Sequence, residues 1–460
     1  MRIYNDLTKK KEEFTPLNDG EVKMYACGIT TSGEAHIGHA LQAMVFDIMR
    51  KFMEKQGYNV RYARNYTDVD DKIIARANEL GVDAMDYAKD MMRKIDKSLA
   101  ELGVDEPTYL LKATDNIDNI IGFVNKLIEK GYAYATPEGD VYYDVAKFAR
   151  YGKLSGRNLD DVKTGTRVEI EDNKHNPLDF ALWKSAKPGE IYWQSPWGRG
   201  RPGWHIECSA MNLATFGEQI DIHGGGRDLL FPHHENEVAQ TEALTGKPFA
   251  KYWVHNGLVK VNGQKMSKSL GNSILLRDIL EQYDNEVIRF AVLQTNYRND
   301  INITDNLFSD AEKHMVHFYE ILKQVDMLNT GRDATINKQI DAEFDEAMSD
   351  DFNMAVAIAN LFKYFKVIKQ NLTTNPQQSI HDANAIRYSY SLLGLFKKTP
   401  DEFLAKIEAD IPADVKKLAD DRLDAKRAKN YALADELRAK IEDLGYEIQD
   451  RKDGYEIIKK

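Results

Sequence analysis

The chain has two cysteines, Cys27 and Cys208, and each lies in a segment rich in other reactive side chains. A histidine and a glutamate, His233 and Glu237, follow the second cysteine at a spacing that places them on one face of a helix. Thiolates, imidazoles and carboxylates are all ligands of zinc. The pattern therefore predicts a zinc site assembled by the fold. The alternative is that each cysteine is a small buried apolar residue, which is the usual role of a lone cysteine.

A second reactive segment is residues 36–39, His-Ile-Gly-His, which follow a predicted strand and precede a predicted helix. Backbone N–H groups at a helix start, with the imidazoles of His36 and His39 on the same side, can hold a triphosphate and stabilise charge that develops on it. Gly38 has no side chain, so a nucleotide base can approach the backbone closely. A tetrapeptide this short also occurs by chance.

A third segment is residues 265–269, Lys-Met-Ser-Lys-Ser, which follow an Asn-Gly pair typical of a hairpin turn. A loop that carries Lys265 and Lys268 suits a mobile clamp whose ammonium groups neutralise a departing pyrophosphate. The alternative is a solvated basic loop. The presence of both this segment and residues 36–39, in this order, argues against that alternative.

The elements that must position these side chains follow from the apolar pattern. Residues 22–27 alternate and predict a strand that enters a tight turn, and the apolar stripe between residues 41 and 53 predicts a helix. Residues 58–63 predict the next strand. A strand, a turn, a helix and a strand in this order open a doubly wound parallel sheet of the Rossmann type, in the α/β class. Such a unit is common, so the fold alone says little about function.

The rest of the chain does not continue this alternation of strands and helices throughout. Hairpin-like and charged segments from about residue 120 to 200 predict an insertion between two halves of the sheet, and helical patterns dominate from about residue 305. We expect a small mixed piece at the C-terminus. The predicted division is the first half of the catalytic domain at 1–120, an insertion at 121–200, the second half at 201–255, a loop and stem-contact region at 256–305, a helical bundle at 306–400 and the small domain at 401–460.

Composition bounds the class of protein. A chain of 460 residues with 43% hydrophobic and 29% charged residues is typical of a soluble globular protein with several domains. No apolar run approaches the length of a membrane span, so we expect no membrane partner. Two cysteines make no disulfide framework, which favours the cytoplasm. The net charge of −11 excludes wholesale coating by nucleic acid but not a local basic face. We expect a monomer.

The two phosphate-facing motifs, in this order within a split sheet, resemble the class I aminoacyl-tRNA synthetases. The resemblance narrows to the cysteinyl-tRNA synthetases, and it extends from the N-terminus past residue 300 and, more loosely, into the C-terminal helices. The segments that carry it are Cys-Gly-Ile-Thr at 27–30, Asn-Tyr-Thr-Asp-Val-Asp-Asp-Lys-Ile at 65–73, Gly-Trp-His-Ile-Glu-Cys-Ser-Ala-Met at 203–211 and the run from His223 to Glu237.

The resemblance implies ATP-dependent ligation of L-cysteine to tRNA(Cys) through cysteinyl-adenylate, with release of AMP and pyrophosphate and with Mg²⁺ bound to ATP. It also implies one zinc ion per chain. Its ligands in that family are two cysteines, a histidine and a glutamate, which fall here on Cys27, Cys208, His233 and Glu237.

The resemblance assigns roles to further residues. Thr67 and Trp204 line the amino-acid pocket, and Asp228 holds the nucleotide ribose. Without the resemblance these are a loop threonine, a core tryptophan and a turn aspartate. The remaining ATP-binding and catalytic residues that it implies are His36, Gly38, His39, Lys265 and Lys268.

The proposed zinc ion has a physical purpose. Cysteine and serine differ by sulfur in place of oxygen, and a hydrophobic pocket discriminates such isosteres poorly. Soft sulfur binds zinc much better than a hydroxyl does.

The resemblance places anticodon recognition in the C-terminal region. There Arg422, Lys426 and Lys429 recur at helical spacing, and the resemblance implies that they contact RNA phosphates. Interleaved acidic residues make a solvated face the alternative.

Three segments depart from the family pattern. Residues 31–33 are Thr-Ser-Gly where relatives have Val-Tyr-Asp, the arginine that often follows the second histidine is Leu41 or Gln42, and residues 454–457 replace a Gly-Thr-x-Trp-like ending. Two alternatives stay open, and the change at residues 31–33 supports the second of them. One is a cysteine ligase that acts on a small amine, as in mycothiol synthesis, and the other is a non-catalytic paralogue that binds tRNA.

Overall fold

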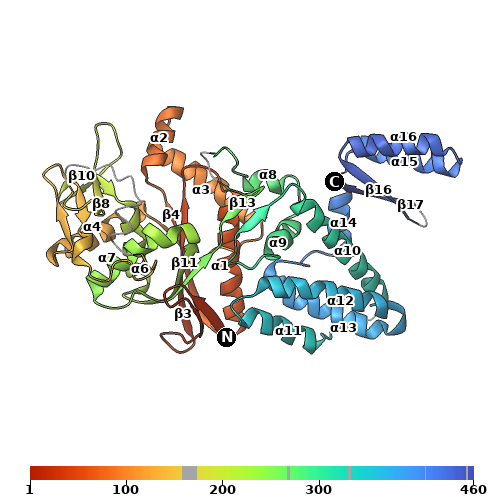
Figure 1. Cartoon of the computed structure of the whole chain (residues 1–460), viewed down its shortest axis with the longest axis horizontal. Coiled ribbons are helices and arrows are strands. Elements are labelled where there is room, and N and C mark those ends of the chain that lie inside the picture. The colour runs from red at the N-terminus through yellow and green to blue at the C-terminus, as the bar shows by residue number, and fades with distance from the viewer. Residues whose placement is uncertain (158–173, 267–269, 330–332, 410, 452–453, 460) are drawn as a thin grey trace.

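A computed structural model describes residues 1–157, 174–266, 270–329, 333–409, 411–451 and 454–459 (Figure 1). Its centre is a five-stranded sheet in which every neighbouring pair is parallel. In spatial order the strands are β12 (Ala250–Asn256), β11 (Ile220–Gly226), β3 (Glu21–Thr30), β4 (Asn59–Thr67) and β5 (Tyr109–Lys112). This is the doubly wound order, and the chain changes direction between β3 and β11. The predicted split Rossmann-type sheet is confirmed.

Helices join these strands and cover the sheet. The apolar stripe predicted between residues 41 and 53 lies in α1 (Ile37–Lys55) and is buried. The other elements of this part are α2 (Asp71–Leu80), α3 (Ala84–Glu101), α6 (Trp204–Phe216), the turns η3 (Arg227–Leu229) and η4 (Leu230–His234), and α7 (Glu235–Thr245).

A second five-stranded sheet interrupts the chain between β5 and β11, and it lies at the left of Figure 1. Its strand pairs are antiparallel. The order is β6 (Ala133–Ala135), β7 (Val141–Tyr143), β8 (Phe180–Ser185), β10 (Gly198–Pro202) and β9 (Trp193–Ser195). The turn η1 (Thr114–Asn116) and helix α4 (Ile117–Glu129) precede the sheet, and the turn η2 (Val145–Lys147) lies between β7 and β8.

Two small hairpins border the central sheet. The first, β1 (Arg2–Asn5) and β2 (Lys10–Glu13), lies against β12 because the Asn5 amide donates to the Lys251 carbonyl at 3.0 Å. The second contains β13 (Val259–Val261) and β14 (Gln264–Lys265), and β15 (Ile301–Ile303) pairs with β13. Asn262 and Gly263 have φ values of 48° and 82°, which confirms the predicted tight turn.

The second half of the chain is mainly helical, as predicted. Its helices are α8 (Leu276–Leu280), α9 (Asn285–Leu293), α10 (Leu307–Leu328), α11 (Lys338–Ser349), α12 (Met354–Thr374), α13 (Pro376–Tyr390), η6 (Ser391–Leu393) and α14 (Pro400–Ala409). One continuous apolar core runs from α1 into this bundle. A smaller unit with its own core follows, composed of α15 (Ala413–Arg427), α16 (Tyr431–Asp443), β16 (Tyr446–Arg451) and β17 (Gly454–Lys459).

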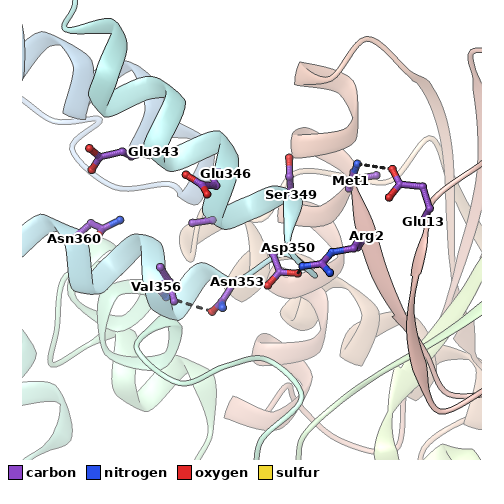
Figure 2. A pocket seen from close by; sticks show the side chains of 11 residues that line it. Met1, Arg2, Glu13, Glu343, Glu346, Ser349, Asp350, Asn353, Val356 and Asn360 are labelled. Carbon is purple, nitrogen blue, oxygen red and sulfur yellow. Dashed lines mark hydrogen bonds and ion pairs between the residues drawn. The ribbon is translucent and has the colours of Figure 1, made fainter.

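The N-terminal hairpin also contacts the helical bundle, and a pocket of about 800 Å³ lies at this junction (Figure 2). The Met1 amine is 3.1 Å from the Glu13 carboxylate, and Arg2 is 2.7 Å from Asp350 at the end of α11. The first ion pair lies within the hairpin, and the second ties the hairpin to the helical bundle across the pocket.

The predicted phosphate contact of Arg422 is wrong. Its side chain is buried, and its guanidinium donates to both carboxylate oxygens of Asp450, at 2.8 and 3.1 Å. Lys426 lies 2.7 Å from the same carboxylate. Hydrogen bonds from Arg422 and Lys426 hold the pKa of Asp450 well below its usual range. These two cations therefore stabilise the C-terminal unit internally.

Within the part of the chain that the structure describes, we find no helix with both the length and the apolar surface that a membrane span requires.

Arg289 joins three parts of the chain and generates a stability prediction. Its buried guanidinium donates to the carbonyls of Leu393, Leu102 and Gly103, at 2.6, 3.2 and 3.1 Å. Arg289→Leu leaves these carbonyls without a donor, so we expect a loss of about 3 kcal/mol of unfolding free energy. The measurement is the thermal unfolding midpoint. Arg277→Leu is the control, because that side chain is 47% exposed and its ion pair with Glu34 contributes little. Equal midpoints for the two variants would contradict the assigned role.

Candidate metal and nucleotide site

A bulge at the end of β3 sets the position of Cys27. The register between β3 and β4 shifts between Ala26 and Ile29, and the Gly28 N–H donates to the side-chain oxygen of Asn65 at 2.9 Å. A Cβ atom at Gly28 would lie 1.5 Å from the Asn65 carbonyl oxygen. Only glycine fits there. Cys27 is thereby placed at the carboxyl end of β3, at the point where ligands bind in doubly wound sheets.

The four predicted ligands meet at this point. The sulfur atoms of Cys27 and Cys208 are 3.6 Å apart, and Cys27 Sγ lies 3.2 Å from Glu237 Oε1. His233 Nε2 is 3.1 Å from the same oxygen, yet it forms no hydrogen bond of normal geometry within the described part of the chain. All four side chains are buried, and their ligand atoms lie within 4.8 Å of one another. Two sulfurs, an imidazole and a carboxylate so arranged fit a metal ion of the zinc type.

The electrostatics of the cluster prepare it for a cation. A hydrogen bond from Cys27 lowers the pKa of the Cys208 thiol to about 6, whereas burial raises the pKa of Cys27 well above its usual range. Burial also acts to raise the pKa of Glu237, but His223 and His233 hold it well below its ordinary value. Interactions within the cluster therefore favour the thiolate of Cys208 and the carboxylate of Glu237, which are the forms that bind a metal ion.

Two further histidines, His223 and His234, surround the cluster, and the sequence did not single them out. His223 Nε2 lies 2.8 Å from Glu237 Oε2, and His234 Nε2 lies 3.3 Å from Cys27 Sγ. With Cys27 and Glu237 they form a second group whose ligand atoms lie within 4.8 Å of one another. The available signal was their place in the His-rich run from residue 223 to 237.

The two histidines of residues 36–39 form the start of α1. His36 is the N-cap, and its Nδ1 accepts from the N–H groups of Gly38 and His39, at 3.2 and 3.3 Å. His39 Nδ1 accepts in return from the His36 N–H at 3.4 Å. The rings are stacked, with centroids 3.5 Å apart. Both imidazoles thus lie at the positive end of the helix, where anions bind.

Met266, the second residue of the Lys-Met-Ser-Lys-Ser segment, approaches this helix start. A Cβ atom at Gly38 would lie 3.4 Å from the Met266 methyl group. The Ile37 N–H donates to the Ile274 carbonyl at 3.0 Å, and the Leu276 N–H donates to the Ala35 carbonyl at 2.9 Å. Lys265 is exposed at the end of β14. Lys268 lies outside the described residues.

Thr67 and Trp204 lie on the metal side of the site. Thr67 Oγ1 donates to the carboxyl of Glu207 at 2.8 Å, and burial raises the pKa of Glu207 well above its ordinary value. Trp204 begins α6 and remains 40% exposed, with its ring centroid 4.3 Å from that of His233. It therefore leaves one of its surfaces open to a ligand beside the cluster.

Asp228 lies on the nucleotide side, exposed in η3 just beyond β11. Gln42, on α1, connects the two sides: its amide donates to the Cys27 carbonyl and its oxygen accepts from the Gly226 N–H at 3.0 Å. Sequence reasoning noted Gln42 only as a departure from the family.

The first departing residue, Thr31, has a structural role. Its side chain is fully buried, and its N–H donates to the Thr67 carbonyl at 3.1 Å. It thereby holds the ends of β3 and β4 together beside the site.

Comparisons with known proteins agree with this geometry. The family model described as "tRNA synthetases class I (C) catalytic domain" matches residues 13–313, and the "DALR domain" model matches residues 343–397. The cysteine–tRNA ligase of Syntrophotalea carbinolica is 45% identical over 99% of this chain and 98% of its own length. That of Carboxydothermus hydrogenoformans is 46% identical over 99% of both chains.

The chain belongs to the cysteine–tRNA ligase family. Solved class I synthetases share its fold at low identity. A methionyl-tRNA synthetase of Mycobacterium tuberculosis, in complex with methionyl-adenylate, superposes with a TM-score of 0.63 at 13% identity and covers 84% of this chain and 93% of its own. A putative arginyl-tRNA synthetase of Campylobacter jejuni gives 0.57 at 13% identity, with 82% and 93% covered.

The close approach of the Asn65 backbone to Gly28 predicts that a larger residue at position 28 destabilises the protein. Gly28→Ala forces β3 away from β4 and moves Cys27, so we expect a loss of about 3 kcal/mol of unfolding free energy. The measurement is a urea unfolding curve. Gly122→Ala is the matched control, because its Cβ would meet nothing within 4 Å on α4. That substitution should stabilise the helix slightly. Equal effects of the two substitutions would rule out the steric argument.

Proposed function

We propose that this chain joins L-cysteine to tRNA(Cys) at the expense of ATP, through cysteinyl-adenylate, and releases AMP and pyrophosphate. The observation that carries the proposal is the connection between the cluster around Cys27 and α1, the helix that begins at His36 and His39: Gln42 of this helix donates to the Cys27 carbonyl. The cluster around Cys27, with a metal ion bound, suits a thiol, and the start of α1 suits a triphosphate. Relatives named cysteine–tRNA ligase over nearly the full length support the same reaction.

In the first step the cysteine carboxylate attacks the α-phosphorus of Mg²⁺-bound ATP. The N-terminus of α1, with His36 and His39, faces the phosphates and stabilises the charge that develops on them. Gly38 leaves space for the base, and Asp228 holds the ribose. Lys265 and Lys268 neutralise the departing pyrophosphate. The chain supplies positioning and charge, and it needs no covalent intermediate of its own.

The metal side selects the amino acid. We assign the bound metal as one zinc ion held by Cys27, Cys208, His233 and Glu237. When bound, zinc supplies a soft Lewis acid that accepts a thiolate far better than a hydroxyl. Trp204 covers the substrate beside His233, and Thr67 with Glu207 forms the adjacent wall.

In the second step the terminal ribose hydroxyl of tRNA attacks the adenylate. The DALR match at residues 343–397 supports tRNA binding by the helical bundle. In our proposal residues 256–305 contact the tRNA stem and the helical bundle at 306–400 binds the anticodon. We further propose that the protein acts as a monomer in the cytoplasm.

The ligand assignment predicts the zinc content of the purified protein. Cys27→Ser and Cys208→Ser replace a soft ligand by a hydroxyl, so bound zinc measured by elemental analysis should fall from one per chain to less than about a tenth. Ser209→Ala is the control, because this buried neighbour bonds to Gln240 and to none of the four ligands. Undiminished zinc in both cysteine variants would refute the site.

The nucleotide assignment predicts the effect of Lys268→Ala. Loss of one charge at the departing pyrophosphate should lower cysteine-dependent pyrophosphate exchange about 100-fold or more. Lys260→Ala is the control, since that lysine on β13 pairs with Asp300 at 3.0 Å. Exchange at the wild-type rate in Lys268→Ala would remove that residue from the reaction.

The same preparation separates the alternatives. Labelled cysteine and ATP, with and without tRNA, should give charged tRNA. Adenylate that forms without charging would favour a ligase acting on a small amine, and absence of activation would favour a non-catalytic tRNA-binding protein.

A further inference from the structure

A pocket of about 450 Å³ lies between α10 and α12, two neighbouring helices of the bundle at the right of Figure 1. We call it the α10–α12 pocket and define it by His317 and Phe318 of α10 and Phe362, Phe365, Lys366 and Lys369 of α12. Its volume is within the range of pockets that hold small ligands. None of these residues belongs to the metal and nucleotide site.

The aromatic side chains of the pocket form one packed group. Phe318 and Phe365 are buried, with stacked rings whose centroids lie 4.3 Å apart. Phe362 packs edge-on against Phe318, with 5.3 Å between ring centroids, and against His314, with 4.9 Å. It nevertheless remains 39% exposed. An exposed ring that its neighbours hold in place can stack on a ligand without a large loss of side-chain entropy.

The charge of α12 differs from that of the chain as a whole. The chain has a net charge of −11, whereas residues 354–374 contain three lysines and no aspartate or glutamate. Lys363 lies 3.2 Å from Glu343 on α11. Lys366 and Lys369 are exposed, line the pocket and form no ion pair within the part of the chain that the structure describes. These two cations therefore give the pocket a local positive potential that attracts anions.

This combination of side chains identifies the ligand by its chemistry. Proteins bind unpaired nucleotides with an exposed aromatic ring beside lysines, because the base stacks on the ring and the ammonium groups contact phosphates. A base inside a duplex is already stacked on its neighbours and cannot enter a pocket. An acidic peptide would satisfy the lysines but would leave the aromatic ring without a flat partner.

We propose that the α10–α12 pocket binds one unpaired nucleotide of the tRNA, with its base on Phe362 and the adjacent phosphates at Lys366 and Lys369. The identity of the RNA rests on the proposed function. Two cations of the C-terminal unit that the sequence predicted to contact RNA pair with Asp450 instead, whereas the two lysines of this pocket are available to it.

The phosphate contacts are tested with the double variant Lys366→Gln, Lys369→Gln. Loss of two contacts to single-stranded RNA should reduce the slope of log Kd against log salt concentration by about 1.4. The measurement is the Kd of the full-length protein for a tRNA(Cys) transcript at several salt concentrations. The matched control is Lys94→Gln, Lys97→Gln, because these lysines have the same spacing on α3 and are 46% and 76% exposed. It changes the net charge equally and should leave the slope unchanged.

The stacking contact is tested at Phe362. Phe362→Leu keeps an apolar side chain against Phe318 but removes the aromatic face, so the affinity for the transcript should fall about 10-fold with no change in the salt slope. Phe362→Trp keeps an aromatic face and should bind within about twofold of the wild type. A packing defect would instead weaken both variants, and thermal unfolding midpoints identify any variant that is destabilised.

Chemical probing of the unpaired bases of the transcript identifies the nucleotide. One base should be protected by the wild type and by Phe362→Trp, and it should be reactive again in the complex with Phe362→Leu.

Support requires the smaller salt slope in the lysine variant but not in its control, the loss of affinity in Phe362→Leu but not in Phe362→Trp, and the protected base. Equal slopes for the lysine variant and its control would overturn the proposal, even if Phe362→Leu failed to fold. If the wild type binds and charges the transcript but the pocket variants bind it equally well, the pocket assignment is wrong and the proposed function stands. If the variants show the expected losses but the wild type does not charge the transcript, the pocket assignment stands and the proposed function is wrong.

Discussion

The architecture depends on bringing Cys27 and Cys208 to a separation of 3.6 Å although they lie 181 residues apart in the sequence. Neither residue reaches the other through local structure. Cys27 is placed by the bulge of β3, where Gly28 lies against the backbone of Asn65, and Cys208 is placed by α6, which follows the insertion in the chain. The parallel sheet joins the two halves, so both must be folded before the cluster exists. Contacts this distant along the chain form late, because their loop-closure entropy must be overcome first.

Much of this arrangement could be predicted from the sequence because its local signals agree with one another. The alternating run at 22–27, the apolar stripe on α1 and the Asn-Gly turn before Lys265 each specify one element through side-chain periodicity or turn chemistry, and the structure confirms all three. The four predicted ligands could be anticipated because two cysteines and a His-x-x-x-Glu pair suggest a metal site and the family resemblance places the ligands on these four positions, and the structure brings them together.

Other features were beyond the sequence because they depend on long-range pairing. Nothing local to Asp6 points to His255, whose Nδ1 lies 2.8 Å from the Asp6 carboxylate although the two residues are 249 apart in the sequence. The same holds for Gln42, which appeared only as a missing arginine but connects Cys27 to Gly226. Arg422 was misread for a related reason: helical spacing placed it in a row of cations, while its partner Asp450 lies on a strand that the helix covers. Charge patterns along one helix do not show which charges are neutralised by another element.

The two histidines at the start of α1 form its first turn, and in the proposed function the same two residues form the phosphate-binding surface. The Nδ1 atom of each ring accepts a hydrogen bond from the backbone of the first helical turn. The backbone of the helix therefore fixes the orientation of both rings toward the proposed nucleotide. Truncation of His36 to alanine would therefore fray the helix as well as remove an imidazole, and a kinetic loss would mix the two effects. Asparagine, which also caps helices, separates them: it retains the turn while it deletes the ring. A substitution at either histidine also removes a capping hydrogen bond of α1. Anion binding at this site therefore cannot be altered at one histidine without a change in the stability of the helix start.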